Sequence, residues 1–256
     1  MRDFDVLVAE AEAADVAGWG FDWLDGRATE ERPPWGYARL LAERLGRASS
    51  ALDLDTGGGE VVAEAPVLPR RMCVTEGWPP NADRARALLG PRGVEVHEAR
   101  PGAPLPFADA SFELVTARHP VSPPWAEIRR VLAPGGRYLA QHVGPASAFE
   151  LIEHFLGPLP EERRARDPDV EAAQAAAAGL TVVRLDTARC RMQLHDVGAV
   201  VWLLRKCVWW VPGFSVDAYR DRLRELDERI RREGPFVAHS TRHLVEARRE
   251  DRSDRQ

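Results

Sequence analysis

The sequence predicts an α/β fold in which a mostly parallel sheet is covered by helices on both faces. Through residues 49–145, short apolar runs alternate with segments of helical character, a pattern typical of strand–helix–strand units. A three-glycine turn, Gly57–Gly59, joins the first apolar run to a helix-compatible segment. Because a single set of such elements spans the middle of the 256 residues, we expect one domain with a substantial core.

The first 48 residues predict a helical N-terminal arm. Two aromatic stretches, at 18–24 and 33–37, precede an expected helix at 38–45. Pro33 and Pro34 interrupt regular structure between them. One interpretation is that these aromatic side chains only pack the arm onto the core.

Five strands are expected in the segment that follows the arm. Ligands of parallel sheets gather at the carboxyl ends of the strands, near the point where the strand order reverses. The residues that follow the expected strand ends are therefore the candidates for binding. The strands are expected at 51–55, 71–75, 94–98, 112–118 and 136–143, and the candidates lie at 55–59, 76–78, 99–103, 118–119 and 142.

The C-terminal half predicts further helices and a long insertion. Helices are expected at 148–156 and 170–178, followed by a sixth strand at 180–186. Residues 190–234 then carry an apolar run, an aromatic cluster and a helix at 215–233 with an apolar stripe. We expect this insertion to be a lid over a substrate pocket. Its tryptophans either line an apolar pocket for an aromatic or hydrophobic substrate or serve ordinary packing: Trp202, Trp209 and Trp210.

The glycine turn predicts a nucleotide-like ligand. Residues without a Cβ let a ligand lie close to the main chain, and a helix beginning here would add free N–H groups. The spacing is neither G-x-G-x-x-G nor that of a P-loop. Glu76 lies 23 positions after Asp53, at the tip of the second expected strand, where a carboxylate can accept from both hydroxyls of a ribose. Together these features suggest an adenosine ligand held without a phosphate cradle.

Four segments, in order, carry a resemblance to the class I S-adenosylmethionine-dependent methyltransferases. They are Leu52–Glu60 (LDLDTGGGE), Val74–Asn81 (VTEGWPPN), Leu105–Val115 (LPFADASFELV) and Glu127–Leu139 (EIRRVLAPGGRYL). The flanking segments resemble a bacterial subgroup of that superfamily. The resemblance implies a Rossmann-like sheet of seven strands, with 237–247 as the last, antiparallel strand. It also implies S-adenosylmethionine as cofactor, S-adenosylhomocysteine as product, and methyl transfer to oxygen, nitrogen or carbon.

The resemblance further implies which residues contact the cofactor. In this family an N-terminal segment often caps the site, which gives the arm's aromatic residues a second interpretation as a closing element. The expected cofactor-binding residues are Trp35, Tyr37, Asp53, Asp55, Thr56, Gly57, Gly58, Gly59, Glu76, Gly77, Trp78, Gly102, Ala103 and Arg118.

Two positions depart from the family pattern. Asp55 stands where the family has the first glycine of the turn. Aspartate tolerates unusual backbone conformations, so the turn is expected to survive, but its carboxylate can approach the cofactor or repel it. Gly102–Pro104 replaces an aspartate that contacts adenine in many relatives, which leaves main-chain groups or stacking on Trp78 for that contact.

Methyl transfer needs few side chains, because the cofactor brings the activated methyl group. His119 and His142, each at the end of an expected strand, are the candidate general bases. The alternative for both is a packing or hydrogen-bonding role. His195, His239 and His243 are expected to be structural, and no sequence spacing predicts a metal site.

Composition limits the partners. A net charge of −5 and a pI near 5.9 argue against a nucleic-acid binder, and eleven arginines in 217–256 are balanced by ten acids. The longest apolar run, 197–204, is too short to span a bilayer, no secretion signal is evident, and the three cysteines indicate no disulfide framework. We expect a cytoplasmic monomer or homodimer, acting on a small molecule, with a disordered tail at 249–256.

Two alternatives remain open at this point. An RNA methyltransferase would need a basic groove beside the transfer site, and Ala117–Pro120 stands in place of the Asn-Pro-Pro-Tyr motif of amino methylation. A methyltransferase-fold protein that binds without catalysing is the other, and Asp55 is its main support.

Overall fold

The computed structural model describes residues 2–18, 20–100 and 102–250, so Trp19 and most of the expected tail lie outside the described residues. Within this part of the chain, eight strands form one sheet in the order β1-β7-β8-β6-β5-β2-β3-β4. The strands are β1 (Ala28–Glu30), β2 (Ser50–Leu54), β3 (Arg71–Glu76), β4 (Glu95–Glu98), β5 (Phe112–Arg118), β6 (Leu132–Val143), β7 (Thr181–Leu194) and β8 (Phe236–Arg248).

Nine α-helices lie in the same described residues. They are α1 (Phe4–Ala13), α2 (Tyr37–Leu45), α3 (Glu60–Ala63), α4 (Pro79–Leu89), α5 (Trp125–Val131), α6 (Phe149–Leu156), α7 (Pro168–Ala177), α8 (Val197–Lys206) and α9 (Arg220–Glu233). Short 3₁₀ turns occur at Asp22–Leu24, Gly90–Arg92 and Glu162–Arg164. None of the helices in the described segments is long and apolar enough to cross a membrane.

The predicted fold class is confirmed. Strands β4, β3, β2, β5 and β6 are paired in parallel, and β8 runs antiparallel to β6 as expected. The sheet has one strand more than the seven expected, because β1 forms in a segment predicted to be helical and pairs with the far end of β7. Strand β7 also continues to Leu194 instead of ending at Asp186, and α9 begins at Arg220 rather than at 215.

The chain divides into two compact units, and β7 and β8 each contribute to both. The larger unit comprises Pro33–Gly144, Arg166–Ala188 and the chain from Arg242 onward, and it contains all the parallel strands. The smaller unit comprises residues up to Arg32, Pro145–Ala165 and Arg189–Thr241.

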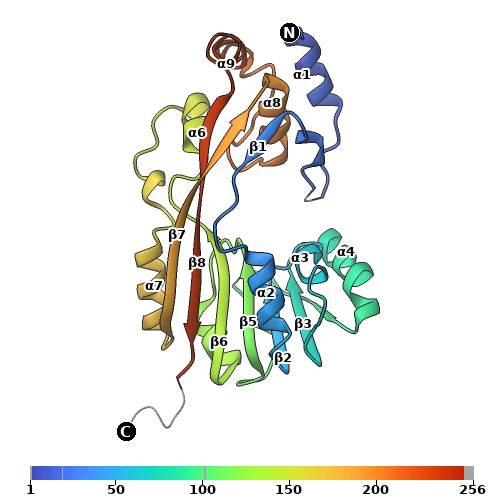
Figure 1. Cartoon of the computed structure of the whole chain (residues 1–256), viewed down its shortest axis with the longest axis vertical. Coiled ribbons are helices and arrows are strands. Elements are labelled where there is room, and N and C mark those ends of the chain that lie inside the picture. The colour runs from blue at the N-terminus through green and yellow to red at the C-terminus, as the bar shows by residue number, and fades with distance from the viewer. Residues whose placement is uncertain (1, 19, 101, 251–256) are drawn as a thin grey trace. The chain divides into compact units, whose positions relative to one another are not determined.

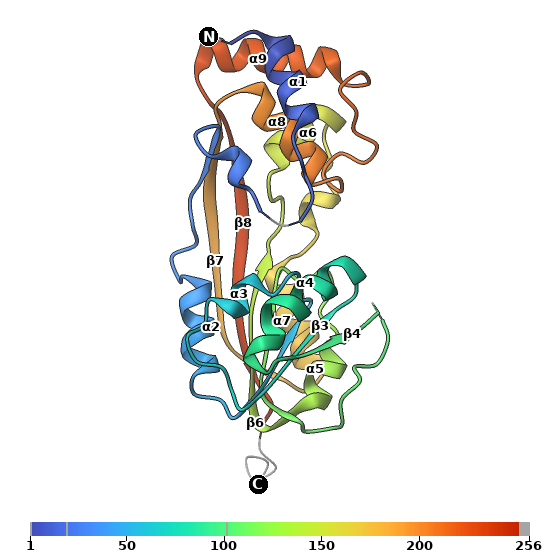
Figure 2. The ribbon, with the colours of Figure 1, turned by 90° about the vertical axis from the view of Figure 1, so that its right-hand side faces the viewer.

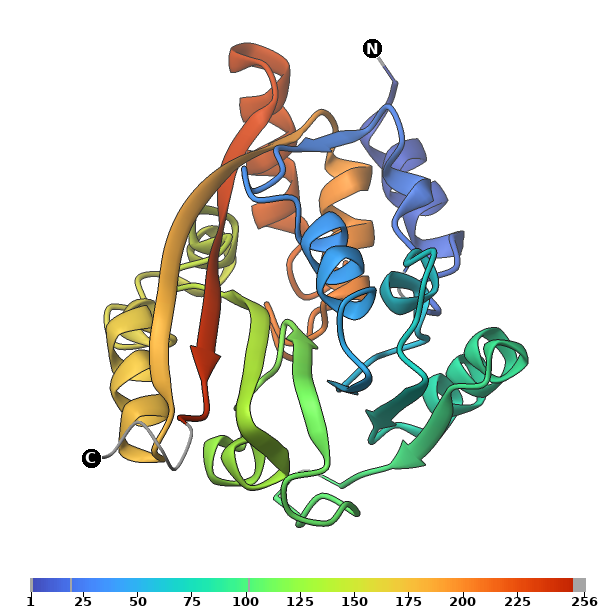
Figure 3. The same cartoon turned by 60° about the horizontal axis from the view of Figure 1, so that its bottom comes forward.

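In the larger unit, helices lie on both faces of the sheet (Figures 1 and 3), and an apolar cluster packs on each face. Leu41 of α2, Val62 of α3 and Leu89 of α4 pack on one face. Ile128 of α5 and Ala175 of α7 pack on the other. Because successive strand residues point to opposite faces, each central strand supplies both layers. This arrangement fixes the strands, so the turns at their carboxyl ends are held in place.

The smaller unit has its own core, built around α8 (Figure 2). Every residue from Val197 to Leu204 is buried, and the Asp196 carboxylate caps the helix by accepting from the Ala199 N–H. The Trp202 ring stacks on Trp23 with centroids 5.7 Å apart. Trp202 is therefore a packing residue of this core, whereas Trp209 is exposed. The apolar stripe of α9 is buried as predicted.

Candidate functional site

The end of β2 is anchored to β5 by a buried acid. The Thr116 hydroxyl donates to Asp53 Oδ1 at 2.5 Å, and Asp53 is almost wholly buried. Burial raises the pKa of Asp53 to about 6, although the hydrogen bond from Thr116 opposes the rise. The carboxyl group therefore holds two neighbouring strands together directly below the glycine turn.

The turn after β2 has the left-handed backbone that its sequence requires. Asp55, Gly57 and Gly59 have φ of 52°, 65° and 86°. Asp55 thus adopts a left-handed conformation, which aspartate tolerates better than most residues. At Gly59 a Cβ would lie 2.7 Å from Leu89 Cδ1, so α4 packs against a position that only glycine fits.

The helix expected after the turn is very short. Helix α3 covers only Glu60–Ala63, so the aligned helix dipole that the sequence suggested is nearly absent. Main-chain N–H groups of the turn itself are the donors available to a ligand there.

Glu76 links this turn to the end of β3. Its Oε2 accepts from the Gly57 N–H and its Oε1 accepts from the Trp78 N–H, both at 2.8 Å. The residue is only 8% exposed. A carboxylate has about four acceptor positions, so two remain for further donors. The side chain is thereby fixed in place with capacity to accept from a vicinal diol.

A second carboxylate lies close to Glu76. Partial desolvation, and then the negative charge of Glu76, raise the pKa of the Asp55 carboxyl group. The Asp55 main-chain N–H donates to Thr75 Oγ1 at 3.4 Å, which ties it to β3. The turn is thus more acidic than one built on three glycines.

The other predicted contacts for adenine lie along the same edge of the sheet. Trp78 is half-exposed at the N-cap of α4. Gly102 and Ala103 follow β4, and the Ala103 N–H donates to the Arg100 carbonyl at 3.1 Å. Since β3 and β4 are paired in parallel, their carboxyl ends lie side by side. Pro101, between Arg100 and Gly102, lies outside the described residues.

A series of hydrogen bonds joins Trp35, one of the two predicted aromatic residues, to His119. The Trp35 indole N–H donates to Gln141 Oε1 at 2.8 Å, and Gln141 Nε2 lies 2.9 Å from His119 Nε2. Tyr37 donates its hydroxyl to the Ala117 carbonyl at 2.9 Å. Both aromatic side chains are buried against the strand ends.

These hydrogen bonds determine which ring nitrogen of His119 carries the proton. An indole N–H only donates, so Gln141 must present its oxygen to Trp35 and its NH₂ to His119. His119 Nε2 therefore accepts, and Nδ1 carries the proton. Burial, followed by the positive charges of Arg242 and Arg118, lowers the pKa of His119 to about 3. The imidazole is neutral near pH 7. Gln141 was not predicted as a site residue from the sequence, although a polar residue near the end of a buried strand could have indicated it.

His142 points to the opposite face of the sheet, because it follows Gln141 along β6. Its Nδ1 lies 2.5 Å from Glu171 Oε2 and its Nε2 lies 3.0 Å from the Tyr138 hydroxyl. His243 Nε2 lies 2.9 Å from the same Glu171 oxygen. Burial lowers the pKa of His142. The structure therefore separates the two candidate bases and engages both ring nitrogens of His142.

Part of the chain matches a known family of domains. Residues 52–140 match the sequence model of the family described as "Methyltransferase domain". No curated protein matches the chain significantly. The matched segment contains the glycine turn, Glu76 and His119, and it ends just before Gln141.

Solved structures share the fold. A "putative methyltransferase" from Bacillus halodurans C-125 is 17% identical, with a TM-score of 0.60, over 83% of this chain and 98% of that one. The YcgJ protein from Bacillus subtilis is 17% identical, with a TM-score of 0.57, over 84% and 98%. A geranyl diphosphate methyltransferase in complex with SAM is 14% identical, with a TM-score of 0.51, over 83% and 84%.

At these identities the structural likeness establishes the fold, and the family model adds the kind of domain. Both agree with the four motifs of the sequence. Residues 52–140 thus match a methyltransferase-domain family model, within a chain that has the fold of the solved methyltransferase structures.

Proposed function

We propose that the protein transfers a methyl group from S-adenosylmethionine to an oxygen, nitrogen or carbon atom of a small molecule. The observation that carries the proposal is the placement of Glu76, whose carboxylate is held by the N–H groups of Gly57 and Trp78 and retains free acceptor positions. A ribose diol needs such an acceptor beside a turn that a ligand can approach closely.

The residues of the larger unit fit the cofactor in three respects. The Asp55–Gly59 turn has left-handed backbone at three positions and is joined to Glu76 by a hydrogen bond. Glu76 would accept from the ribose hydroxyls. The half-exposed Trp78 ring is available to stack on adenine in place of the family's aspartate. When bound, the cofactor supplies a methyl group already activated by the positive charge on sulfur.

The protein's own contribution would be to position the acceptor and exclude water. His119 follows β5 and is held rigidly by Gln141 and by its main-chain N–H, which donates to the Gln141 carbonyl at 2.7 Å. We propose that its neutral ring orients the acceptor through the Nδ1–H group. A general-base role would require the ring to break the contact with Gln141 and to accept a proton against its low pKa.

Binding of the cofactor is the first test. Calorimetry of the full chain with S-adenosylmethionine and S-adenosylhomocysteine should give saturable binding of both. Absence of binding would favour a methyltransferase-fold protein without catalysis, for which the Asp55 carboxylate offers a reason.

The acceptor is the second test. The protein would be incubated with cofactor carrying an isotope-labelled methyl group and with fractionated small-molecule extract or, separately, with RNA, and labelled products would be sought by mass spectrometry. Label in a small molecule supports the proposal, whereas label recovered only in added RNA would contradict it.

A further inference from the structure

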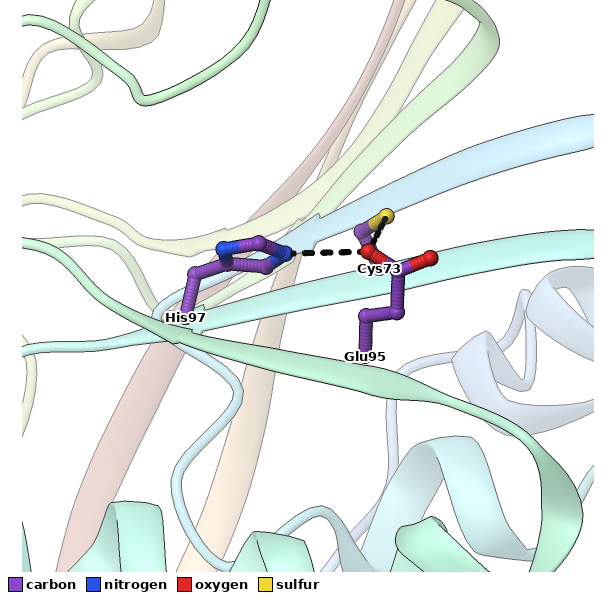
Figure 4. A group of neighbouring side chains, drawn as sticks. All are labelled: Cys73, Glu95 and His97. Atoms are coloured by element: carbon purple, nitrogen blue, oxygen red, sulfur yellow. Dashed lines mark hydrogen bonds and ion pairs between the residues drawn. The ribbon is translucent and has the colours of Figure 1, made fainter.

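Three side chains from two neighbouring strands converge on one face of the sheet, within the larger unit. Cys73 of β3 pairs in register with Glu95 of β4, and His97 lies two residues further along β4. All three therefore point to the same face. Glu95 Oε2 lies 3.9 Å from Cys73 Sγ and 3.3 Å from His97 Nε2 (Figure 4). One donor atom from each residue lies within 4.8 Å of the others.

These separations fit a tetrahedral metal centre better than direct hydrogen bonds. With metal–ligand bonds of about 2.3 Å to sulfur and about 2.0–2.1 Å to nitrogen and oxygen, tetrahedral angles place nitrogen and oxygen about 3.3 Å apart and sulfur and oxygen about 3.5 Å apart. The 3.3 Å between His97 Nε2 and Glu95 Oε2 matches the first value. The 3.9 Å between Cys73 Sγ and Glu95 Oε2 exceeds the second by a small amount, which movement of one side chain can remove. Both contacts are long for a hydrogen bond to a carboxylate.

A second cluster in the same unit lacks this spacing. His142 and His243 approach the same oxygen of Glu171 at 2.5 and 2.9 Å. These are hydrogen-bond lengths, shorter than the separation of two ligands on one metal ion, and two imidazole N–H groups donating to one carboxylate oxygen account for them. The comparison favours the Cys73 cluster as the ion site.

The burial of the three residues also suits an ion at the surface of the sheet. Cys73 is fully buried, whereas the side chains of Glu95 and His97 are 63% and 33% exposed. The His97 ring is oriented by an edge-on contact with Phe107, with centroids 4.8 Å apart. An ion bound by all three would have the thiolate beneath it and a fourth position toward solvent. Thiolate, imidazole and carboxylate together are a donor set for Zn²⁺ rather than for Mg²⁺ or Ca²⁺.

We propose that Cys73, Glu95 and His97 bind a Zn²⁺ ion whose fourth ligand is water. Binding replaces the thiol proton of Cys73, which is released to solvent, and no electron transfer takes place. The ion joins β3 to β4 through side chains, at the edge of the sheet, and so adds to the stability of that edge. The residues are separated along the chain, which is why no sequence spacing indicated the site.

The test uses the full chain, purified under reducing conditions, treated with a chelator and then transferred to chelator-free buffer. Titration with Zn²⁺ should give binding of about one ion per chain, with proton release and a rise in the unfolding temperature. Titration with Co²⁺ should give absorption bands from a thiolate-bound, four-coordinate ion. Absence of binding, or Co²⁺ spectra without a sulfur ligand, would overturn the proposal.

Zn²⁺ affinities of single-residue variants test which side chains bind the ion. Cys73→Ser and His97→Asn should each weaken Zn²⁺ binding by at least about tenfold, because each removes a direct ligand. Cys207→Ser, which changes another buried cysteine outside any disulfide, should bind as the parent does. Cys73 is buried, so a change there can also disturb folding. Glu95→Gln alters an exposed side chain and should leave the fold intact, and it should also weaken Zn²⁺ binding. Unchanged affinity in these variants, or loss only in Glu171→Gln, would place the ion elsewhere.

Discussion

The Gly57 N–H donates to Glu76 Oε2 at 2.8 Å, so a side chain joins the turn after β2 to the end of β3. The same carboxylate accepts from Trp78 through its other oxygen. The geometry of the turn and the position of the acidic group therefore depend on each other, and a change at Glu76 affects both.

Glu76→Ala should weaken S-adenosylmethionine binding by more than tenfold. The variant loses hydrogen bonds to a charged group, worth about 1.5–3 kcal/mol, together with the contact that orders the turn. Calorimetry measures the change. Glu98→Ala is the matched control, because Glu98 is the register partner of Glu76 on β4 but pairs with Arg86, and it should bind normally. Equal affinities for Glu76→Ala and the parent would remove Glu76 from the ribose site.

Asp55→Gly should increase cofactor affinity without loss of stability. Glycine adopts the observed φ of 52° more readily than aspartate, and the substitution removes a negative charge beside Glu76. Asp55→Ala removes the same charge, but alanine has a Cβ and no polar side chain to stabilise a left-handed backbone. This variant should therefore have an unfolding free energy about 1–2 kcal/mol lower than that of Asp55→Gly. If both variants bind more weakly than the parent, the Asp55 carboxylate contributes to binding instead of opposing it.

His119→Gln should lower turnover while the dissociation constant of S-adenosylmethionine stays the same. The pKa of about 3 keeps the ring neutral above about pH 4, so His119 itself should give no inflection in the rate between pH 5 and 8. NMR titration of the imidazole checks the pKa directly. A rate inflection near pH 6.5 that disappears in the variant would show instead that His119 titrates and acts as the base.

Asp53 should make the stability depend on pH. Its pKa is about 6 in the folded chain against an ordinary value of 3.8, so the folded state holds the proton more tightly. The resulting stabilisation is present below about pH 4 and is lost as the pH rises through 6. A shift of about two pKa units corresponds to up to about 3 kcal/mol.

Asp53→Asn isolates this effect, because the amide oxygen can still accept from Thr116. Urea unfolding of the parent and the variant should show that the parent's stability relative to the variant falls between pH 4 and 7. A difference that does not change with pH would mean that Asp53 is ionised with an ordinary pKa.

Strands β2, β3 and β5 could be predicted from the sequence because each contains a short apolar run, whereas β4 reads Glu-Val-His-Glu and alternates instead. Strand β1 could not, since three residues, Ala28–Glu30, carry no periodicity and their partners near Leu194 are distant in sequence. The turn was expected to tolerate aspartate at position 55, and the structure gives Asp55 a left-handed backbone with φ of 52°. The lid role of 190–234 and the closing role of the arm stay predictions.

Clusters of side chains from neighbouring strands could not be predicted from the sequence, for a different reason. The contact between Cys73 and Glu95 depends on the register of β3 with β4, which no local pattern specifies. The bond between Gln141 and His119 likewise depends on the pairing of β5 with β6. Sequence patterns located the strand ends, while the pairing of the strands decided which side chains meet there.

The hydrogen-bonded chain from Trp35 to His119 has one further consequence. Trp35 and Gln141 both lie outside the segment 52–140 that matches the methyltransferase family, whereas the glycine turn and Glu76 lie inside it. The proposed contacts to the cofactor thus lie within the matched segment, whereas Trp35 and Gln141, which decide which imidazole nitrogen of His119 carries its proton, lie outside it. Trp35→Phe would remove the indole N–H that holds Gln141 Oε1. The Gln141 amide could then rotate and present its oxygen to His119, so that Nε2 rather than Nδ1 would carry the proton. No residue of the segment 52–140 would be changed.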